Sequence, residues 1–178
     1  MNPLAEILNE IEAKELWERD LLVERNEFII KAGEINTNLY FVESGSVNVF
    51  VVEQDEEQSI RFGYQNSFFG ALDSFLSDKP THFYFQAIKQ TYLKVISKID
   101  FMELINQSEK LMWHWQQIMG ELIVQQMERE RDLLTNSPKE RYLRVLKRSP
   151  QLFQEIPSKY IASYLRMTPE TLSRIKKG

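Results

Sequence analysis

Cysteine is absent from the 178 residues of the chain. This absence excludes disulfide bonds, a cysteine nucleophile, thiolate zinc sites and iron–sulfur clusters held by cysteine, and it is typical of proteins in a reducing cytosol. Long apolar runs are also missing, because the amino-terminal segment MNPLAEILNEIEAKELW alternates acids with apolar residues and has no basic start. We therefore expect no signal peptide and no membrane span, and a soluble, cytoplasmic protein.

Histidines are few, and phosphate loops of the G-x-x-x-x-G-K type are absent. His82 and His114 fall on a predicted loop and a predicted helix, and the spacing of nearby acids completes no metal site with either. The acidic run at residues 53–57 is typical of a solvated turn rather than of a catalytic pair. We expect no metal, no cofactor and no enzymatic activity.

The charge of the chain is strongly divided along its length. The net charge is −4, but residues 138–178 hold ten Lys or Arg against three Glu, a balance of +7 that leaves −11 for the rest. A basic segment on an acidic body is what a nucleic-acid reader with a separate sensing part needs, because neutralised phosphates supply most non-specific affinity. The alternative is a solvated basic face.

Hydrophobic residues make up 43% of the chain, enough for a core in one moderate domain with a small appendage. Residues 4–19 have the spacing of an amphipathic helix. Short segments rich in Phe, Tyr, Val and Ile follow, separated by turn-forming residues, which predicts a β-sandwich or closed roll. The predicted strands are residues 28–30, 39–43, 46–53, 58–63, 83–88 and 91–97.

From residue 97 the pattern changes to helices, a short one over residues 97–107 and a long one over residues 109–134. At 1.5 Å per residue the long helix spans roughly 37 Å, so it overhangs a small roll. Its apolar residues recur at 4-3-4 spacing, which favours pairing with the same helix of a second copy over packing within one chain. The expected contact residues are Leu111, Trp115, Ile118 and Leu122.

The next helix begins at Ser137, which has the pattern of an N-cap followed by Pro138 and Glu140. The preceding residues 135–136 are the expected hinge. We place the end of this helix at Lys147 and a loop over residues 151–157.

The segment SKYIASYLRMTPETLSRIKK predicts a helix-turn-helix. Its apolar residues are spaced to seal two crossing helices, and Ala162 is small where the helices approach closely. Thr168 and Pro169 start the second helix as N-cap and first helical residue. Arg166 falls in the turn, where the left-handed conformation is usual and a non-glycine residue costs about 1 kcal/mol. An ordinary helical hairpin is the alternative.

The second of these helices is the candidate DNA reader. Arg174 suits a guanine edge, Glu170 suits the amine of cytosine, and the lysines suit phosphates. The outward-facing residues are Glu170, Thr171, Ser173, Arg174 and Lys177.

The order of roll, long helix and terminal helix-turn-helix resembles the Crp/Fnr superfamily of bacterial transcription regulators over nearly the full length. KAGEINTNLYFVESGSVNVF is similar to the opening hairpins of the family's β-roll, and IPSKYIASYLRMTPETLSRIKK looks most like its short, wingless members found in Bacteroidetes. The resemblance implies an α+β fold. Residues 1–107 would form a cyclic-nucleotide-binding-like β-roll (a double-stranded jelly roll), residues 108–135 a dimerisation helix, and residues 136–178 a helix-turn-helix DNA-binding domain.

The resemblance also assigns partners and roles. It implies double-stranded DNA, a second copy of the chain and, in the family's manner, RNA polymerase as partners. Glu170 and Arg174 match base-contacting positions, whereas Pro169 replaces a base-contacting arginine. The residues that match backbone-contacting or nearby positions are Ser158, Lys159, Thr168 and Thr171.

The stretch FFGALDSFLSDKPTHFYFQ, residues 68–86, reads like a loop that closes over a phosphate, yet it contains no Arg and its acids look misplaced. It resembles the family's phosphate-binding cassette, in which Gly70 is kept, Ala71 stands for a ribose-binding Glu, and Thr81 and His82 stand for Arg and Ser. A buried phosphate without its guanidinium costs several kcal/mol, and a hydroxyl cannot replace a bidentate fork. We predict no physiological binding of cyclic AMP or cyclic GMP.

A different ligand remains possible at this cavity. Its expected wall is apolar to mildly polar, which suits a neutral or weakly acidic metabolite as an unidentified effector; the other interpretation is a cavity packed shut in a constitutive protein. The expected wall residues are Phe69, Gly70, Ala71, Leu72, Thr81, His82, Tyr84, Gln125 and Gln126.

Three hypotheses for the function follow. The first is a homodimeric transcription regulator that reads a palindromic site, with two recognition helices about 34 Å apart. The second is a small-molecule-binding β-roll module whose helical tail makes protein contacts. The third, a β-roll enzyme, is disfavoured because metal ligands are missing.

Overall fold

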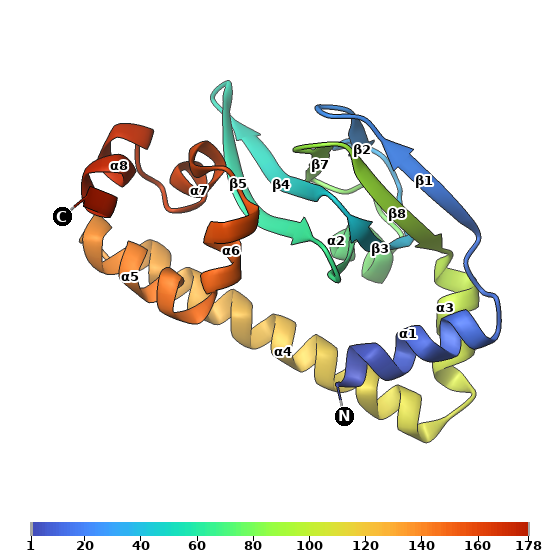
Figure 1. The fold of residues 1–178 in the computed structure, drawn as a ribbon. Coiled ribbons are helices and arrows are strands. Elements are labelled where there is room, and N and C mark those ends of the chain that lie inside the picture. Colours follow the sequence, from blue (N-terminus) through green and yellow to red (C-terminus); the bar gives the residue numbers. More distant parts are fainter. Residues whose placement is uncertain (1, 178) are drawn as a thin grey trace.

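The computed structural model describes residues 2–177 as an α+β fold, in agreement with the predicted fold class (Figure 1). Two four-stranded antiparallel sheets form the β-roll. The first has the strand order β1 (Arg19–Val23), β8 (Thr91–Ile96), β3 (Leu39–Ser44) and β6 (Phe68–Gly70). The second has the order β2 (Phe28–Ile30), β7 (Tyr84–Ala87), β4 (Ser46–Glu53) and β5 (Glu56–Tyr64).

The core of the roll lies between the two sheets, because apolar side chains on their inner faces pack against one another. It consists of buried residues such as Tyr40, Val42, Val47, Val49, Phe85, Leu93 and Val95. The tight turn from β3 to β4 depends on Gly45, whose φ is +103°. A Cβ there would lie 2.4 Å from Thr91 Oγ1, so only glycine fits.

A second core joins the roll to three helices: α1 (Pro3–Ala13), α3 (Lys98–Asn106) and the first half of α4 (Glu109–Leu134). Helix α4 has the predicted bounds and runs below the roll, with α1 and α3 against one end of it (Figure 1). Trp115 packs edge-on against Phe101 at 5.0 Å between ring centroids. The overhang expected from helix length is present at the other end.

The last four helices cover that other end of α4. They are α5 (Pro138–Arg148), α6 (Pro150–Glu155), α7 (Ser158–Tyr164) and α8 (Pro169–Lys177). Their shared core includes Val145, Leu152, Ile161, Leu165 and Leu172, together with Ile88 from the roll. Because Ile88 belongs to this core, the carboxy-terminal helices are packed onto the roll as well as onto each other.

Several predicted boundaries are wrong. Strands β1 and β6 are not among the predicted strands, and the stretch expected to be a loop contains β6 and helix α2 (Leu72–Ser77), whereas β7 falls within the predicted strand at residues 83–88. Helix α6 lies in the expected loop at residues 151–157.

The first helix is shorter than predicted. It ends at Ala13, because Glu15 adopts a left-handed φ of 52°. Leu16 and Trp17 therefore pack against the second core from outside the helix. Within residues 2–177, none of the helices combines the length and the apolar character that crossing a membrane requires.

Candidate nucleic-acid interface and phosphate cassette

Helices α7 and α8 are joined by a short turn that has the expected left-handed residue, Arg166, with φ of 50°. Its N–H donates to Ser163 O at 3.0 Å, and the N–H of Met167 donates to Ala162 O at 3.0 Å. Thr168 caps α8, because its Oγ1 accepts the N–H of Thr171 at 3.2 Å. The two helices therefore cross in a fixed relation, sealed by the buried apolar residues of the third core.

A buried arginine ties this turn to the hinge that follows α4. Arg141 is 7% exposed and donates from Nε to Leu165 O at 2.6 Å and from Nη2 to Arg166 O at 3.1 Å. Its Nη1 donates to Thr135 O at 2.5 Å. Sequence reasoning counted Arg141 only as a cation of the basic segment; the available signal was its place four residues before the buried Val145, on the inner face of α5.

A second buried charge cluster joins the end of α4 to α5. Asp132, with a side chain 0% exposed, accepts from Arg144 Nε at 3.0 Å and from Arg148 Nη2 at 2.5 Å. Burial is the largest single influence on Arg148 and lowers its pKa, but the hydrogen bond to Asp132, the charge of Asp132 and Tyr164 together outweigh it, so the pKa is raised. Arg144 also pairs with Glu128 at 3.0 Å. Sequence reasoning missed this cluster, which only the packing of two helices creates.

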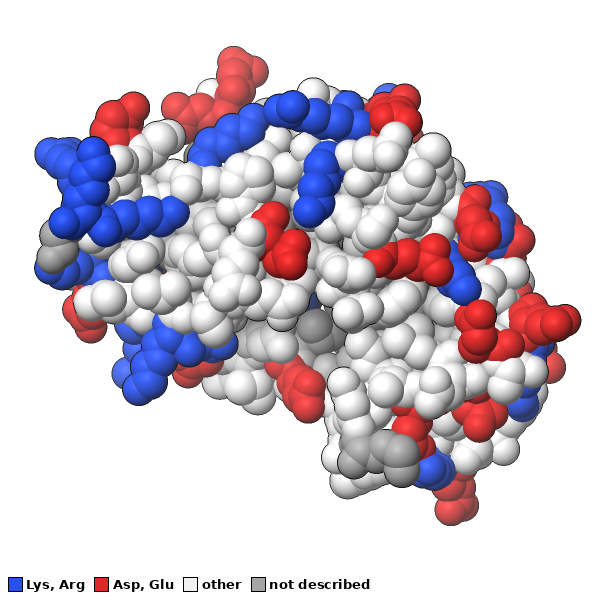
Figure 2. Space-filling view, viewed as in Figure 1, with Lys and Arg blue, Asp and Glu red and all other residues white. Residues whose placement is uncertain are grey.

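Three of the ten cations in residues 138–178 are thus engaged inside the protein. The seven others are Lys139, Lys147, Lys159, Arg166, Arg174, Lys176 and Lys177, and all are exposed. Figure 2 shows Lys and Arg gathered over the carboxy-terminal helices, whereas Asp and Glu dominate the side that carries the amino-terminal helix. The exposed charge of the basic segment is therefore concentrated where α8 lies.

The residues of the candidate reader lie as expected on the surface of α8. Glu170, Ser173, Arg174 and Lys177 are exposed, and Thr171 is half-buried. The pKa of Glu170 is lowered, first by a hydrogen bond from its own backbone N–H at the helix start. Its carboxylate is therefore ionised at neutral pH and can accept a hydrogen bond from a donor outside the chain.

Helix α7 begins beside the end of α8. Lys176 Nζ donates to Ser158 Oγ at 2.8 Å. Lys159, the next residue of α7, is exposed and lies over the ring of Tyr160, 4.4 Å from its centroid. The predicted backbone-contacting residues Ser158 and Lys159 are thus next to the reader helix.

Helix α7 is also held to strand β5. The N–H of Ser59 donates to Ser163 Oγ at 3.0 Å, and the same hydroxyl donates to Glu57 O at 3.0 Å. The guanidinium of Arg129, from α4, lies 3.7 Å from the ring centroid of Tyr164. Burial lowers the pKa of Arg129. These contacts fix the carboxy-terminal helices against the roll, and the sequence carries no signal for them.

The phosphate cassette contains an internal anion. Asp73, in the first turn of α2, accepts from Thr81 Oγ1 at 2.8 Å and 3.0 Å through its two oxygens. It also accepts the N–H of His82 at 3.0 Å and that of Ser74 at 2.9 Å. Thr81 is 1% exposed, so its hydroxyl is committed to this carboxylate. Sequence reasoning noted misplaced acids here but did not assign Asp73.

The other predicted pocket residues differ in their burial. Gly70 is required, because a Cβ there would lie 2.8 Å from Leu39 Cδ2. Ala71 is 0% exposed, Phe69 stacks on Tyr40 at 5.2 Å, and Tyr84 stacks on Phe50 at 5.3 Å. Leu72 is half-buried in the second core. His82, Gln125 and Gln126 are exposed.

The four residues predicted to contact a second copy of the chain differ in their burial. Leu111 and Trp115, 6% and 9% exposed, belong to the second core of this chain, so the interpretation of packing within one chain applies to them. Ile118 is half-buried and packs against the same core, whereas Leu122 is half-buried and is not part of that core. A different face of α4 is exposed at 3-4 spacing: Trp113, Gln117, Gly120, Val124, Met127, Arg131 and Leu134. We call these seven residues the α4 seam.

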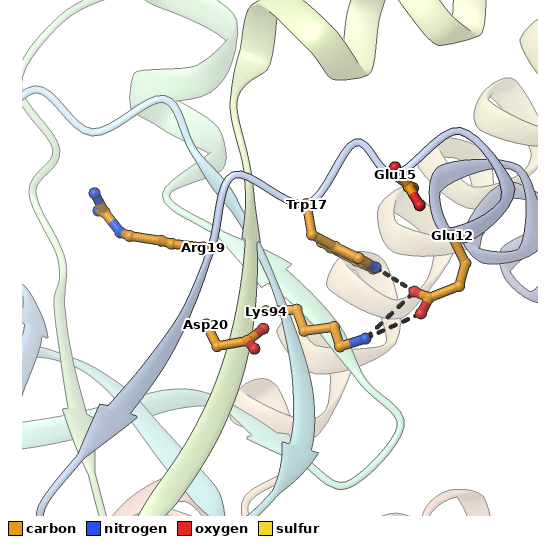
Figure 3. Close-up of a pocket in the computed structure, with 6 residues that line it drawn as sticks. All are labelled: Glu12, Glu15, Trp17, Arg19, Asp20 and Lys94. Atoms are coloured by element: carbon orange, nitrogen blue, oxygen red, sulfur yellow. Dashed lines mark hydrogen bonds and ion pairs between the residues drawn. The ribbon is translucent and has the colours of Figure 1, made fainter.

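Two open surface cavities lie outside the cassette. One of about 280 Å³ is lined by Glu12, Glu15, Trp17, Arg19, Asp20 and Lys94 (Figure 3). Glu12 accepts from Trp17 Nε1 and, at 3.3 Å, from Lys94, so the central polar groups of this cavity satisfy one another. The second, about 470 Å³, lies between the roll and the carboxy-terminal helices. Neither is lined by the predicted pocket residues.

The sequence of the roll is similar to a known domain family. Residues 21–108 match the model of the cyclic nucleotide-binding domain. The catabolite activator protein of Thermus thermophilus is 22% identical with a TM-score of 0.61, and 98% of this chain and 85% of that chain are covered. No curated protein matches the chain in sequence.

Two further solved structures have the same architecture. A CooA variant from Carboxydothermus hydrogenoformans is 16% identical with a TM-score of 0.73, and 98% of this chain and 82% of that chain are covered. FixK2 of Bradyrhizobium japonicum is 19% identical with a TM-score of 0.72, and the coverage is 89% and 82%. Residues 21–108 are thus similar to a cyclic nucleotide-binding domain, and the chain as a whole shares its fold with these solved structures.

Proposed function

We propose that the protein is a homodimeric transcription regulator of the Crp/Fnr type that reads a palindromic DNA site through α8. The observation that carries this proposal is the exposed face of α8, where Glu170 and Arg174 stand beside Lys177 on a capped helix. Such a helix presents base-reading groups and phosphate-binding groups together, as recognition in the major groove requires.

Arg141 is the positioning residue of this proposal. It holds the hinge at Thr135 and the turn at Leu165 and Arg166 through three donated hydrogen bonds. Because these bonds span the junction between α4 and the reader, the direction of α4 determines the direction of α8. Two copies related by a two-fold axis can thus place both readers about 34 Å apart.

The α4 seam supports the homodimer. Val124, Met127 and Leu134 are 60%, 63% and 82% exposed, and they lie three and seven residues apart, in step with the heptad of a helix pair. Gly120, four residues before Val124 on the same face, has open space where a Cβ would be, which allows a close helix approach. In a two-fold dimer, the seam of one copy would pack against the same seam of the other copy, which is what an isologous contact requires.

The cassette supports a regulator that does not respond to cyclic AMP. The donors that a phosphate would use, Thr81 Oγ1 and the N–H of His82, already donate to Asp73. A second anion at this place would meet the carboxylate without any guanidinium to offset the repulsion. Any effector of the protein is therefore expected to bind without a phosphate in the cassette, and RNA polymerase remains an expected partner by resemblance.

The alternative is a binding module whose carboxy-terminal helices contact another protein. The contacts of α7 with β5 through Ser163 favour it, because they hold these helices on the roll. The basic exposed surface favours DNA instead, since a protein that contacts a neutral partner does not need seven exposed cations.

Selection of bound DNA from a random pool separates the two functions. We expect a palindromic consensus with half-sites one helical turn apart, which reports DNA binding, dimerisation and spacing at once. The absence of any enriched sequence, together with no shift of genomic fragments at low salt, would contradict the proposal and favour the protein-contact module.

A further inference from the structure

A groove lies on the surface between the roll and the carboxy-terminal helices. Its volume is about 470 Å³. Its walls are Arg25, Ser46, Ile88 and Lys89 from the roll, and Glu155, Pro157, Lys159 and Tyr160 from the segment that joins α6 to α7.

The two walls are held together by buried contacts. Ile88, 6% exposed, packs in the core of the carboxy-terminal helices. Nearby, Ser163 Oγ bridges the N–H of Ser59 and the carbonyl of Glu57 at 3.0 Å each. The cations on the roll therefore keep a defined position relative to α7 and α8.

The groove carries an excess of positive charge. It has three cations, Arg25, Lys89 and Lys159, and one acid, Glu155. Lys89 pairs with Glu155 at 3.8 Å, but their side chains are 53% and 30% exposed, and such exposed pairs are weak. Among residues 2–177, no ion pair is described for Arg25 or Lys159. The charge of the groove is thus available to a partner.

This charge continues the surface of the reader. Lys176 of α8 contacts Ser158 at 2.8 Å, Lys159 follows in the sequence, and Lys159 borders the groove that Arg25 lines on its other side. Figure 2 shows Lys and Arg side chains along this face, from the carboxy-terminal helices toward the roll. The cations of the roll that line the groove therefore belong to one basic band with those of α7 and α8.

We propose that the β-roll itself takes part in DNA binding: Arg25 and Lys89, with Lys159 between them and α8, bind backbone phosphates that flank the half-site. This inference rests on the proposed function, because it needs α8 in the neighbouring major groove. DNA is the partner that fits, since a row of exposed cations with little base-reading chemistry matches a phosphate backbone. The contacts supply positioning that a short carboxy-terminal domain lacks.

The test compares DNA fragments of two lengths. One fragment contains only the selected palindrome, and the other extends it by about one helical turn on each side, which is the reach at which flanking phosphates become available. The variant Arg25→Ala/Lys89→Ala removes two groove charges. The control Lys31→Ala/Lys79→Ala removes two exposed charges of the roll outside the groove.

On the long fragment, we expect the groove variant to bind several-fold more weakly and the slope of log K against log salt to fall by about 2 per protomer, since each phosphate contributes about 0.9. On the short fragment, the groove variant and the wild type should bind alike. The control should match the wild type on both fragments.

Three results would overturn the inference. They are an equal loss on both fragments, no loss on either, and the same loss for the control as for the groove variant. In each case Arg174→Ala still tests the reader separately, because it should weaken binding to both fragments. Wild-type protein that binds neither fragment would overturn the proposed function instead.

Discussion

The phosphate cassette and the carboxy-terminal helices differ in which of their charged and polar groups are paired inside the protein. In the cassette, one internal acid, Asp73, takes up the hydroxyl and amide donors that an anion would need. In the carboxy-terminal helices, internal acids neutralise only the arginines at the base, such as Arg144 and Arg148, and the cations around α8 stay free. This difference agrees with the proposed function, in which α7 and α8 bind DNA and the cassette takes no phosphate.

The largest effect is expected from a charge in the α4 seam, because both readers depend on the dimer. Val124→Glu places two like charges across the two-fold axis and should produce monomers that lose tight binding to the palindrome. Sedimentation and gel shift measure the two effects. Ile99→Glu, at a site that is 78% exposed on α3, is the matched control and should stay dimeric. A dimeric Val124→Glu protein would place the interface elsewhere.

The next effect tests the base of the carboxy-terminal helices. Asp132→Ala leaves Arg144 and Arg148 without their buried acceptor and should lower the free energy of unfolding by about 3 kcal/mol. Denaturant titration measures this. Glu128→Gln removes a partner that is 39% exposed and should cost less than about 1 kcal/mol. Equal costs for the two variants would show that Asp132 is not the centre of the cluster.

A smaller effect tests the reader directly. Arg174→Ala should weaken binding to the selected palindrome by about 1–3 kcal/mol and leave binding to random DNA nearly unchanged. Lys177→Ala should instead weaken binding to all sequences alike and reduce the salt slope by about 1. Titrations on both kinds of DNA give these values. An equal loss on specific and random DNA for Arg174→Ala would contradict its role as a base reader.

The smallest effect tests the closed cassette. Asp73→Asn keeps one carbonyl oxygen but brings an amide against Thr81 and His82, and it should lower the free energy of unfolding by about 1 kcal/mol. Thermal unfolding measures this cost. Isothermal titration should detect no binding of cyclic AMP by the wild type. Micromolar affinity in the wild type would show that the carboxylate can be displaced, and the contrast between the two regions would fail.

Local sequence signals predicted local structure well. The bounds of α4, the cap at Thr168 and the left-handed turn at Arg166 all follow from residues close together in the chain. Strand β6 was missed because it has only three residues, and β1 because its segment RDLLV is mostly exposed and lacks alternation.

The long-range contacts were beyond such signals. Asp73 reaches Thr81 across a helix and a turn, and Arg141 reaches Leu165 over 24 residues, so their roles depend on how separate elements pack. The prediction of the dimer contact was limited in the same way, because it depends on how α4 packs. The residues at 4-3-4 spacing include Trp115, which the fold uses for its own core, while the exposed seam includes polar and glycine positions that hydrophobicity alone does not select.

The contact of Ser163 with β5 has a consequence for how the carboxy-terminal helices can move. Strand β5 is the outermost of its sheet, and α7 covers backbone groups there that would otherwise be open to another strand. A displacement of the carboxy-terminal helices from the roll would uncover this edge strand. The open backbone groups of β5 would then be able to pair edge to edge with a strand of another molecule, so the packing of α7 also protects the chain from association.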